Sequence, residues 1–466
     1  MKLHTKNLLS LFSTDIINRI LGGVATIYLA RTLDTSSFGI INFALAILSY
    51  GLIFANPGLN IIGTRSIAQK NVSPKPLTQT IINLKCILSL LVFCVGIIIS
   101  LFFLEQHLQL TTVLFLCSLF PSAFLLEWYF QGKENLAIIG VGRTVWSIIY
   151  TAFIVLFVHS SQKLYLVPIA WGISLIIQAT VLLFFYKQSV NDEEKITNTI
   201  SWKTLLQQSF PVGKVAIITQ ILLNLPFILL GYIGTTTEIA HYSAASKLVF
   251  FLLVIDRILY FIFFPLLSRT FVNSPELLSK HVERLVKYLL ILCLPICGGT
   301  ILFSSSLISF IFGNSYEEAS LLLQIQIWYF FFTVCNSIFS FTLLAIEKEQ
   351  LYSRVTTFIS ICTILGIILF TYFGKSIGAS YGMTIGEAIL AMVMWYKVHT
   401  IISVKIIRHL LQSLLATFIM IGCLIFLPTM HIVFSILAGF FIYGIAIIIV
   451  GGFTKEDFLF IKERLV

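Results

Sequence analysis

Two charged side chains lie one helical turn apart in the first apolar segment of this 466-residue chain: Asp15 and Arg19, within residues 7–29. A charge inside a membrane-spanning helix costs about 2.5 kcal/mol or more, so such a side chain is usually turned away from lipid and used. Both side chains face the same side of the helix, and Arg19 lies roughly 18 Å along it from Asn7. We expect Arg19 to bind an anionic group in an internal cavity, with Asp15 restraining it or taking part in ion coupling. The alternative is a neutralised pair that holds helices together.

Three further cations fall inside apolar segments of the second half: Lys214, Lys247 and Arg257. On one regular helix Arg257 would lie roughly 15 Å along the axis from Lys247 and about 80° around it. These side chains are expected to line a cavity wall at successive depths and bind the same anionic ligand. Snorkelling to the membrane interface is the alternative for the two lysines. Asp256 lies about 180° from Lys247 on that helix, so both cannot face the cavity squarely. Asp256 is a candidate for ion coupling or pairing.

Four other charges in apolar segments give weaker signals. Lys85 and Arg143 are nearer the expected cytoplasmic ends of their helices, which favours snorkelling or anchoring at the interface. Glu127 and Glu387 are candidate Na⁺ or H⁺ ligands. For both glutamates a helix-end or packing role is favoured, because no second carboxylate occupies a matching position on the same helix. No metal, cofactor or catalytic site is expected.

The elements that must position these charges are membrane-spanning helices. Hydrophobic residues make up 58% of the chain, charged residues 11%, and the mean hydropathy is +0.98, whereas about a quarter of the residues in a soluble domain are charged. Apolar runs of about 20 residues, long enough to cross the hydrocarbon as a helix, recur from end to end. The sequence predicts an all-α polytopic membrane protein with about fourteen transmembrane helices, twelve being the alternative, near residues 7–29, 37–57, 79–104, 110–131, 137–158, 163–186, 205–232, 239–268, 283–312, 319–344, 353–373, 376–398, 406–427 and 431–451.

The distribution of Lys and Arg over the connections predicts the orientation. With a cytoplasmic N-terminus, the connections on the opposite side carry only Arg31, Lys163 and Lys375. Both termini are therefore expected on the cytoplasmic side of the cell inner membrane. The net charge of +10 follows from this topology. Because the basic residues are spread over short loops and form no continuous patch, nucleic acid is not an expected partner.

A weak internal repeat relates the two halves of the chain. Residues 30–44 match residues 231–245 at an offset of 201, and residues 131–134 match residues 346–349. Because each copy holds six helices, the copies have the same orientation and are related by a pseudo-two-fold axis along the membrane normal. We expect a central cavity that opens to either side, and four parts: an N-lobe of helices 1–6 (1–190), a cytoplasmic connection (191–204), a C-lobe of helices 7–12 (205–400), and helices 13–14 with a cytoplasmic tail (401–466).

Glycines recur every four residues near the end of the second lobe, at Gly374, Gly378, Gly382 and Gly386. A stripe of small residues lets two helices pack at close distance. Tight packing inside the second lobe is the favoured interpretation, and a sliding surface during transport is the alternative.

Several segments resemble a known family. They are ARTLDTSSFG (30–39) and NPGLNIIGTRSIAQ (56–69) in the first half, and SFPVG (209–213), FFPLLSRTF (263–271), LPICGGTILFSSSLISFIFGNSYEEA (294–319) and GASYGMTIGEAI (378–389) in the second. By the order and spacing of these segments, the chain resembles, over most of its length, the polysaccharide (O-antigen type) flippases of the multidrug/oligosaccharidyl-lipid/polysaccharide exporter superfamily.

The resemblance implies two six-helix lobes in a V-shaped transporter that hydrolyses no ATP. Its cargo would be an oligosaccharide built on undecaprenyl pyrophosphate and moved from the cytoplasmic to the outer leaflet. For such a flippase we expect a gradient of Na⁺ or H⁺, or the membrane potential, to drive the movement, with a polysaccharide polymerase and chain-length proteins as partners. The chain also contains no G-x-x-x-x-G-K-[ST] loop, the usual phosphate-binding motif of ATPases.

Three other functions are weighed against this one. A cation-coupled multidrug exporter would share the fold, but intramembrane cations outnumber the nearby carboxylates, which suits an anionic cargo better. A peptidoglycan-precursor flippase of the same superfamily fits the segments less well than the polysaccharide branch. A membrane polysaccharide polymerase or glycosyltransferase generally needs a sizeable extramembrane loop with catalytic groups, and the outer loops here are short and poor in His, Asp and Glu.

Overall fold

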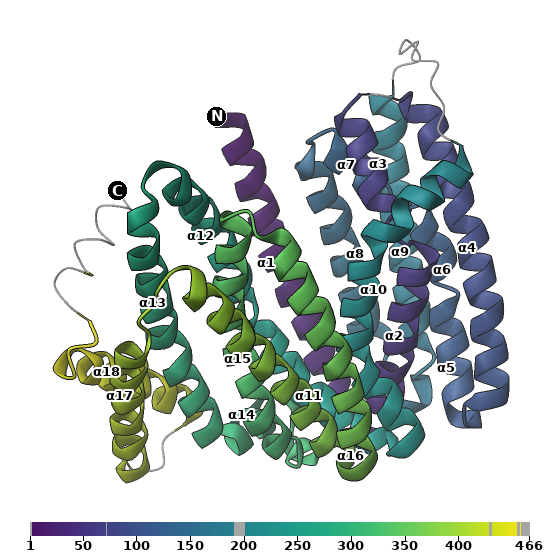
Figure 1. Ribbon diagram of the computed structural model, residues 1–466. Helices are drawn as coiled ribbons and strands as arrows, with labels where there is room; N and C mark the ends of the chain where they lie inside the picture. Colours follow the sequence, from purple (N-terminus) through teal and green to yellow (C-terminus); the bar gives the residue numbers. More distant parts are fainter. Residues whose placement is uncertain (1, 71, 191–200, 428–430, 454–456, 458–466) are drawn as a thin grey trace. The chain divides into compact units, whose positions relative to one another are not determined.

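The computed structural model describes residues 2–70, 72–190, 201–427, 431–453 and 457 (Figure 1). Every regular element within these ranges is a helix. The chain forms two compact units, Met1–Ala240 (unit 1) and His241–Val466 (unit 2), and each is described by itself. Of the predicted connection 191–204, residues 191–200 lie outside the described residues.

The described residues of unit 1 form ten α-helices and one 3-10 helix, together with the start of another helix, α11 (Thr236–Leu252). In chain order they are α1 (Lys2–Thr32), α2 (Thr35–Ala55), α3 (Leu59–Ala68), α4 (Pro74–Phe103), α5 (Gln106–Leu116), α6 (Leu119–Ala123), α7 (Glu127–Gly132), α8 (Leu136–Phe157), η1 (Ser161–Lys163), α9 (Leu166–Ser189) and α10 (Trp202–Ile233). α10 packs against α2 and α3, so by its contacts it belongs to unit 1. The lobes 1–190 and 205–400 are defined by the internal repeat and not by contacts, and they remain a prediction.

Unit 2 contains the rest of α11 and the helices that follow it. They are α12 (Val254–Asn273), α13 (Pro275–Leu302), α14 (Ser304–Phe312), η2 (Asn314–Tyr316), α15 (Ala319–Ala345), α16 (Glu349–Ile401), α17 (Ile407–Phe426) and α18 (Ile432–Ile449). α15 packs against α12, α13 and α16, and α17 packs against α13 and α18.

The predicted count of fourteen membrane spans is confirmed. Among the described residues, twelve helical segments are long and apolar enough to cross a membrane. One of them, α16, is 53 residues long and contains a non-helical residue, Lys375 (φ 45°, ψ −126°), at which two helices meet. Counting its two halves separately and adding the 31-residue α1 gives fourteen. The break at Lys375 lies where the sequence predicts it.

The two halves of α16 pack against each other through the glycine stripe. A Cβ on Gly378 would collide with the carbonyl oxygen of Phe370, and a Cβ on Gly382 would lie 2.8 Å from the Cα of Ile367. Only glycine therefore allows this separation between the two backbones. Gly378, Gly382 and Gly386 thus pack helices tightly inside unit 2, as the favoured interpretation predicts. Gly374 takes no part in this packing, because no atom lies within 4 Å of a Cβ added there.

Three predicted helices are interrupted in the structure. The segment predicted at 110–131 is divided into α5, α6 and α7, the segment at 239–268 into α11 and α12, and the segment at 283–312 into α13 and α14. Pro121 lies in the short α6, where its missing N–H weakens a continuous hydrogen-bond ladder. Hydropathy does not detect such breaks because the apolar run continues across them. The short helix α3, a further helix in the connection after α2, is too short to produce a spanning signal.

Matching turns support the repeat. α2 starts at Thr35 and α11 at Thr236, the predicted offset of 201. Asp34 caps α2 by accepting a hydrogen bond from the backbone N–H of Ser37 (3.2 Å). At the matching place Thr235 and Glu238 form a reciprocal capping box, with N–H to side-chain distances of 3.2 Å and 2.9 Å. The same polar turn therefore starts both helices.

The second predicted match is displaced in register. Glu134 and Glu347 both have positive φ, 58° and 59°, and each lies two residues before the helix that follows, α8 or α16. The structure therefore pairs Glu134 with Glu347, whereas the sequence alignment pairs it with Glu349. The alignment is wrong by two residues because it follows letter similarity, and the equivalent feature is the backbone turn.

Two of the segments that carry the family resemblance meet in unit 1. Gly58 (φ +85°) precedes α3, and a Cβ on it would lie 2.5 Å from the carbonyl oxygen of Ser209 in α10. A Cβ on Gly213 would in turn lie 2.7 Å from the carbonyl carbon of Pro57. The segments NPG and SFPVG thus form one close backbone contact between the start of α3 and α10.

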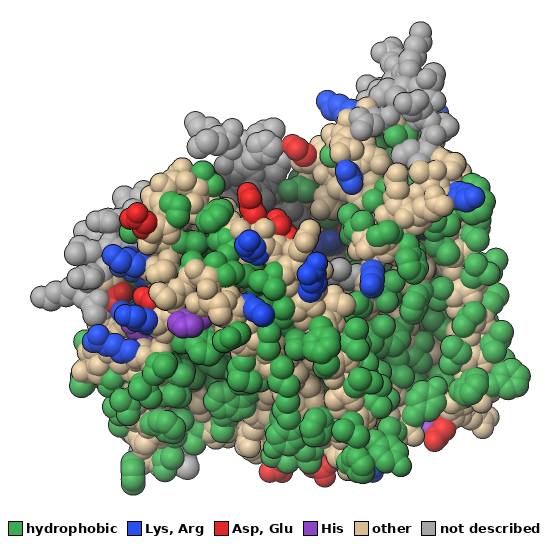
Figure 2. All heavy atoms as spheres, in the orientation of Figure 1, with side chains coloured by type: hydrophobic (Ala, Val, Ile, Leu, Met, Phe, Trp, Pro, Cys, Tyr) green, Lys and Arg blue, Asp and Glu red, His purple; other side chains and the backbone are tan. Residues whose placement is uncertain are grey.

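The flanks of both units suit a lipid environment. Large apolar side chains are highly exposed, among them Phe102 (78%), Phe373 (78%) and Phe426 (90%). Figure 2 shows hydrophobic side chains along the flanks of the helices, while most visible Lys and Arg side chains of each unit gather toward one end of its helices. Exposed apolar surface of this extent is typical of a membrane protein.

Candidate functional site

The charged site of unit 1 starts where α8 packs against α1. Along this contact Ser147 Oγ donates to the carbonyl of Asn18 (3.4 Å), and Thr151 Oγ1 donates to that of Leu21 (3.2 Å). One turn before Ser147, the Arg143 guanidinium lies 3.6 Å from Asp15 Oδ1. Two polar hydrogen bonds and an ion pair thus fix α8 on α1 inside an otherwise apolar segment.

Arg143 makes a stronger interaction with Glu127, the first residue of α7. Its Nε donates to both carboxylate oxygens (3.0 Å and 3.2 Å), and its Nη2 donates to Oε2 (2.6 Å). Gln178 of α9 is a third donor, and its hydrogen bond to Oε1 (2.9 Å) is the fourth that the carboxylate accepts. A carboxylate offers about four acceptor positions, so the acceptor capacity of Glu127 is filled. This bidentate pairing is the geometry that guanidinium and carboxylate groups favour.

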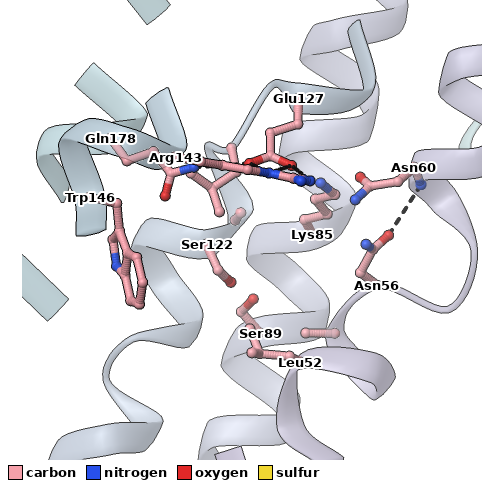
Figure 3. Close-up of a pocket in the computed structure, with 13 residues that line it drawn as sticks. Leu52, Asn56, Asn60, Lys85, Ser89, Ser122, Glu127, Arg143, Trp146 and Gln178 are labelled. Carbon is pink, nitrogen blue, oxygen red and sulfur yellow. Dashed lines mark hydrogen bonds and ion pairs between the residues drawn. The ribbon is translucent and has the colours of Figure 1, made fainter. Parts of the chain in front are cut away.

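A cavity of about 310 Å³ adjoins this ion pair. Figure 3 shows Lys85 of α4 and Arg143 of α8 extending into the same space, with Asn60 of α3 turning its side-chain amide toward Lys85. The other residues that line the cavity are mostly small or polar: Leu52, Ala55, Asn56, Ser89, Ser122, Ala123, Leu125, Glu127, Trp146 and Gln178. The lining carries two cations and one carboxylate, so its net charge is positive when all three are ionised.

The predicted pairing of Asp15 with Arg19 is not what the contacts show. Asp15 has Arg143 as an ion-pair partner, 128 positions further along the chain. Arg19 is half-buried and makes no hydrogen bond or ion pair with any residue that the structure describes. The two side chains still lie on one side of α1, and the part of Arg19 in ligand binding remains a prediction.

The other three predicted cations are distributed over both units. Lys214 is exposed on α10 in unit 1, Lys247 is partly buried in α11, and Arg257 is exposed on α12. α11 ends at Leu252 and α12 begins at Val254, so the expectation of one regular helix carrying Lys247 and Arg257 is wrong. The interruption at Leu253 changes the angle between the two side chains, and their roles in binding stay predictions.

Two carboxylates face a polar stripe on α15 in unit 2. Glu387 of α16 accepts a hydrogen bond from Asn336 Nδ2 (3.0 Å), and Asn336 Oδ1 accepts one from Ser340 (3.1 Å). Asp256 of α12 lies near Ser337, and its Oδ1 is buried without a hydrogen-bond partner among the described residues. Asp256 is near enough to Glu387 to act on it electrostatically. Glu387 has no second carboxylate at a matching position on its own helix, but Asp256 on α12 provides one.

Lys85 and Arg143 are the residues that sequence reasoning undervalued. Lys85 is only 3% exposed, which excludes the expected snorkelling to the interface, and Arg143 is held by two carboxylates. The sequence does contain a signal for Lys85. It follows Leu77 and Ile81 at intervals of four residues, and all three belong to the buried face of α4. For Arg143 no such signal exists, because its partners are in other helices.

Nothing in the described part of the chain suggests a metal centre: no group of three or more His, Cys, Asp or Glu side chains is placed to hold a metal ion.

A family model described as polysaccharide biosynthesis protein matches residues 4–271. No curated protein shows a significant match to the chain. Among solved structures, the chain is similar to lipid II flippase MurJ in an inward closed conformation, with a TM-score of 0.77, 15% identity, and coverage of 94% of this chain and 97% of that one. It is also similar to an inward-facing multidrug resistance MATE family transporter of the MOP superfamily, with a TM-score of 0.68, 14% identity, and coverage of 85% and 98%.

A third similar structure is a MOP superfamily transporter from Pyrococcus furiosus, whose binding pocket is described as having reverse polarity. Its TM-score is 0.55 at 12% identity, with coverage of 86% of this chain and 95% of that one. At these identities the similarities establish the fold alone, which this chain shares with MurJ and with the MATE family transporter.

Proposed function

The chain belongs to the polysaccharide biosynthesis protein family, and from this premise we propose that it is a flippase for lipid-linked oligosaccharides. Its cargo is an oligosaccharide repeat unit on undecaprenyl pyrophosphate, such as an O-antigen unit. The protein moves the cargo from the cytoplasmic to the outer leaflet by alternating access, and the pyrophosphate binds to cations in a central cavity.

The observation that carries this proposal is Arg19. Its guanidinium lies well inside the 31-residue α1 and makes no ion pair with a described residue, while the nearby Asp15 pairs with Arg143. Exposing a guanidinium to lipid is costly, so an intramembrane Arg is expected to bind a ligand or line a wet cavity. Guanidinium groups are particularly suited to phosphate because their planar fork donates two parallel hydrogen bonds. Lys214, Lys247 and Arg257 contribute further positive charge to the pyrophosphate path.

The proposed energy source is a Na⁺ or H⁺ gradient acting on the carboxylates of unit 2. Asp256 and Glu387 come from different helices and interact electrostatically, and a bound cation or proton reduces the repulsion between two carboxylates. Asp15 and Glu127 are held by Arg143, which favours a structural part for them.

The proposed location is the inner membrane with both termini in the cytoplasm, because the basic residues of the connections are concentrated on that side. A polysaccharide polymerase and chain-length proteins would act on the glycan after it has crossed the membrane.

A cation-coupled multidrug exporter is the second candidate. It is favoured by the similarity of the fold to a MATE transporter over 85% of this chain and by the two carboxylates of unit 2. The excess of intramembrane cations in unit 1 argues for an anionic cargo.

The two candidates are distinguished by transport into inside-out membrane vesicles, with undecaprenyl-pyrophosphate-linked glycan or a cationic dye as cargo. We expect glycan movement that requires the protein and falls at least tenfold in both Arg19→Ala and Lys247→Ala at matched expression. Lys280→Ala, which changes an exposed lysine of α13, is the control and should transport normally. Export of the dye without movement of the glycan would replace the flippase proposal with the multidrug one.

A further inference from the structure

The cavity inside unit 1 contains an ammonium group that the fold itself does not satisfy. Lys85 is 3% exposed and lines the cavity, yet it makes no hydrogen bond and no ion pair within 4 Å to any described residue. Its three N–H groups are strong donors, and leaving a buried charge without a hydrogen-bond partner is unfavourable. The cavity therefore needs an acceptor at Lys85.

The nearest carboxylate does not provide that acceptor. Lys85 interacts with Glu127 only electrostatically, since the oxygens of Glu127 already accept hydrogen bonds from Arg143 and Gln178. Arg143 is further balanced by Asp15, 3.6 Å away. Arg143 pairs with both carboxylates, and the charges of Asp15, Glu127, Arg143 and Lys85 balance. What Lys85 lacks is a hydrogen-bond acceptor among the described residues.

Neutral groups around Lys85 suit the same kind of ligand. Asn60 turns its side-chain amide toward Lys85 (Figure 3), and that amide makes no hydrogen bond with the described residues. Ser89 and Ser122 donate their hydroxyl protons to the carbonyl of Leu119. A ligand at Lys85 thus meets an ammonium and an amide as donors, in a cavity whose volume of about 310 Å³ is at the small end of ligand pockets.

We propose that this cavity binds a phosphate group, with Lys85 and Asn60 as its donors. A phosphate offers several oxygens to convergent donors and forms charge-assisted hydrogen bonds with an ammonium group. The group comes either from the lipid-linked substrate or from free inorganic phosphate or pyrophosphate. The inference rests on the proposed function for its ligand class and adds a phosphate site separate from Arg19, Lys214, Lys247 and Arg257.

The site is tested by ligand binding to the purified full-length protein in detergent at constant ionic strength. The probes are sodium pyrophosphate and undecaprenyl phosphate, with sodium chloride as the ionic control, and the readouts are the shift of the thermal unfolding midpoint and calorimetric titration. We expect at least one of the two phosphate probes to bind saturably. Lys85→Gln should weaken that binding at least tenfold, whereas Lys85→Arg should retain most of it and Lys280→Gln, on the exposed face of α13, all of it.

The outcomes separate the source of the phosphate. Binding of both probes through Lys85 supports a site open to free phosphate, and binding of the lipid probe alone supports a site for the substrate. The proposal is overturned if neither probe binds the wild type, or if Lys85→Gln binds as tightly as the wild type. If the wild-type protein transports the glycan but binds neither probe, the phosphate site is rejected and the flippase proposal is retained. Binding at Lys85 without glycan transport would reject the flippase alone.

Discussion

Arg143 and Glu127 join α8 to α7 through a bidentate ion pair that also reaches Asp15 on α1. The pair therefore holds three elements of unit 1 together beside the cavity. Removing one partner leaves the other charge poorly compensated in a low-dielectric region, which costs about 3–5 kcal/mol for a fully buried pair. Arg143 is 42% exposed, and solvent screening reduces that cost.

We expect Glu127→Ala to lower the free energy of unfolding by about 1–3 kcal/mol. Thermal unfolding of the purified variant in detergent measures the effect, and Glu105→Ala, which removes a carboxylate that is 78% exposed, is the matched control. Equal unfolding temperatures for Glu127→Ala and Glu105→Ala would show that the pair does not stabilise unit 1.

Gly213 provides a test of the contact between α10 and the start of α3. A Cβ there would lie 2.7 Å from the carbonyl carbon of Pro57 and 2.8 Å from its oxygen, so the two backbones must separate in Gly213→Ala. Overpacking of this kind typically costs about 1–3 kcal/mol. The matched control is Gly366→Ala in α16, where no atom lies within 4 Å of the added carbon and alanine favours the helix by about 1 kcal/mol. A Gly213→Ala variant as stable as the wild type would contradict the close contact.

The membrane spans were predictable because each one is encoded locally. An apolar run of sufficient length specifies a helix whatever surrounds it, and the break at Lys375 separates two such runs. The partners of charged residues are not encoded in this way. The one-turn spacing of Asp15 and Arg19 predicts that Asp15 restrains or neutralises Arg19, yet the ion-pair partner of Asp15 comes from α8. The position of Lys85 along its own helix predicts a side chain at the membrane interface. That position contains no information about the other helices that cover the side chain.

The stability of the start of α2 is expected to depend on pH through its capping residue, Asp34. Burial works to raise the pKa of Asp34, but hydrogen bonds from Ser161 and Ser37 outweigh it and leave the pKa below its ordinary value of 3.8. Because the pKa of Asp34 is lower in the folded protein, its ionised form stabilises the fold at any pH above the ordinary pKa. This stabilisation is lost as the pH falls through the pKa of the folded state.

Replacing Asp34 by alanine is expected to cost about 0.5–2 kcal/mol at neutral pH through loss of the helix cap, toward the lower end because the side chain is exposed. Asp34→Asn preserves a capping oxygen without the charge. As the pH falls below 3.8, the free energy of unfolding should therefore decrease less for Asp34→Asn than for the wild type. Unfolding measured across this pH range tests the claim, and identical acid profiles for wild type and Asp34→Asn would refute it.

A buried ion pair attaches Asp457, near the C-terminus, to unit 2. Lys287 Nζ of α13 donates to Asp457 Oδ2 (2.5 Å), and the hydroxyl of Tyr288 donates to Oδ1 (3.1 Å). Both charged side chains are at most 10% exposed. Asp457→Ala is expected to destabilise the protein by about 3–5 kcal/mol, because Lys287 would lose its carboxylate in a buried position.

The effect of Asp457→Ala is measured by thermal unfolding of the purified variant in detergent. Glu317→Ala is the control, since Glu317 is an exposed carboxylate of the same unit. Equal unfolding temperatures for Asp457→Ala and Glu317→Ala would show that the ion pair does not stabilise unit 2.

The central claim, that this chain moves a lipid-linked oligosaccharide through a cavity containing Arg19, is tested most directly with purified protein in liposomes. A fluorescent undecaprenyl-pyrophosphate-linked glycan is placed in the membrane, and the label exposed on the outer surface is destroyed by a reductant that does not cross the bilayer. The account predicts that wild-type protein exposes glycan from both leaflets, so that most of the label is lost, whereas Arg19→Ala leaves about half protected, as protein-free liposomes do. The account is contradicted if about half of the label stays protected in liposomes that contain correctly folded wild-type protein, both with an imposed Na⁺ or H⁺ gradient and without one.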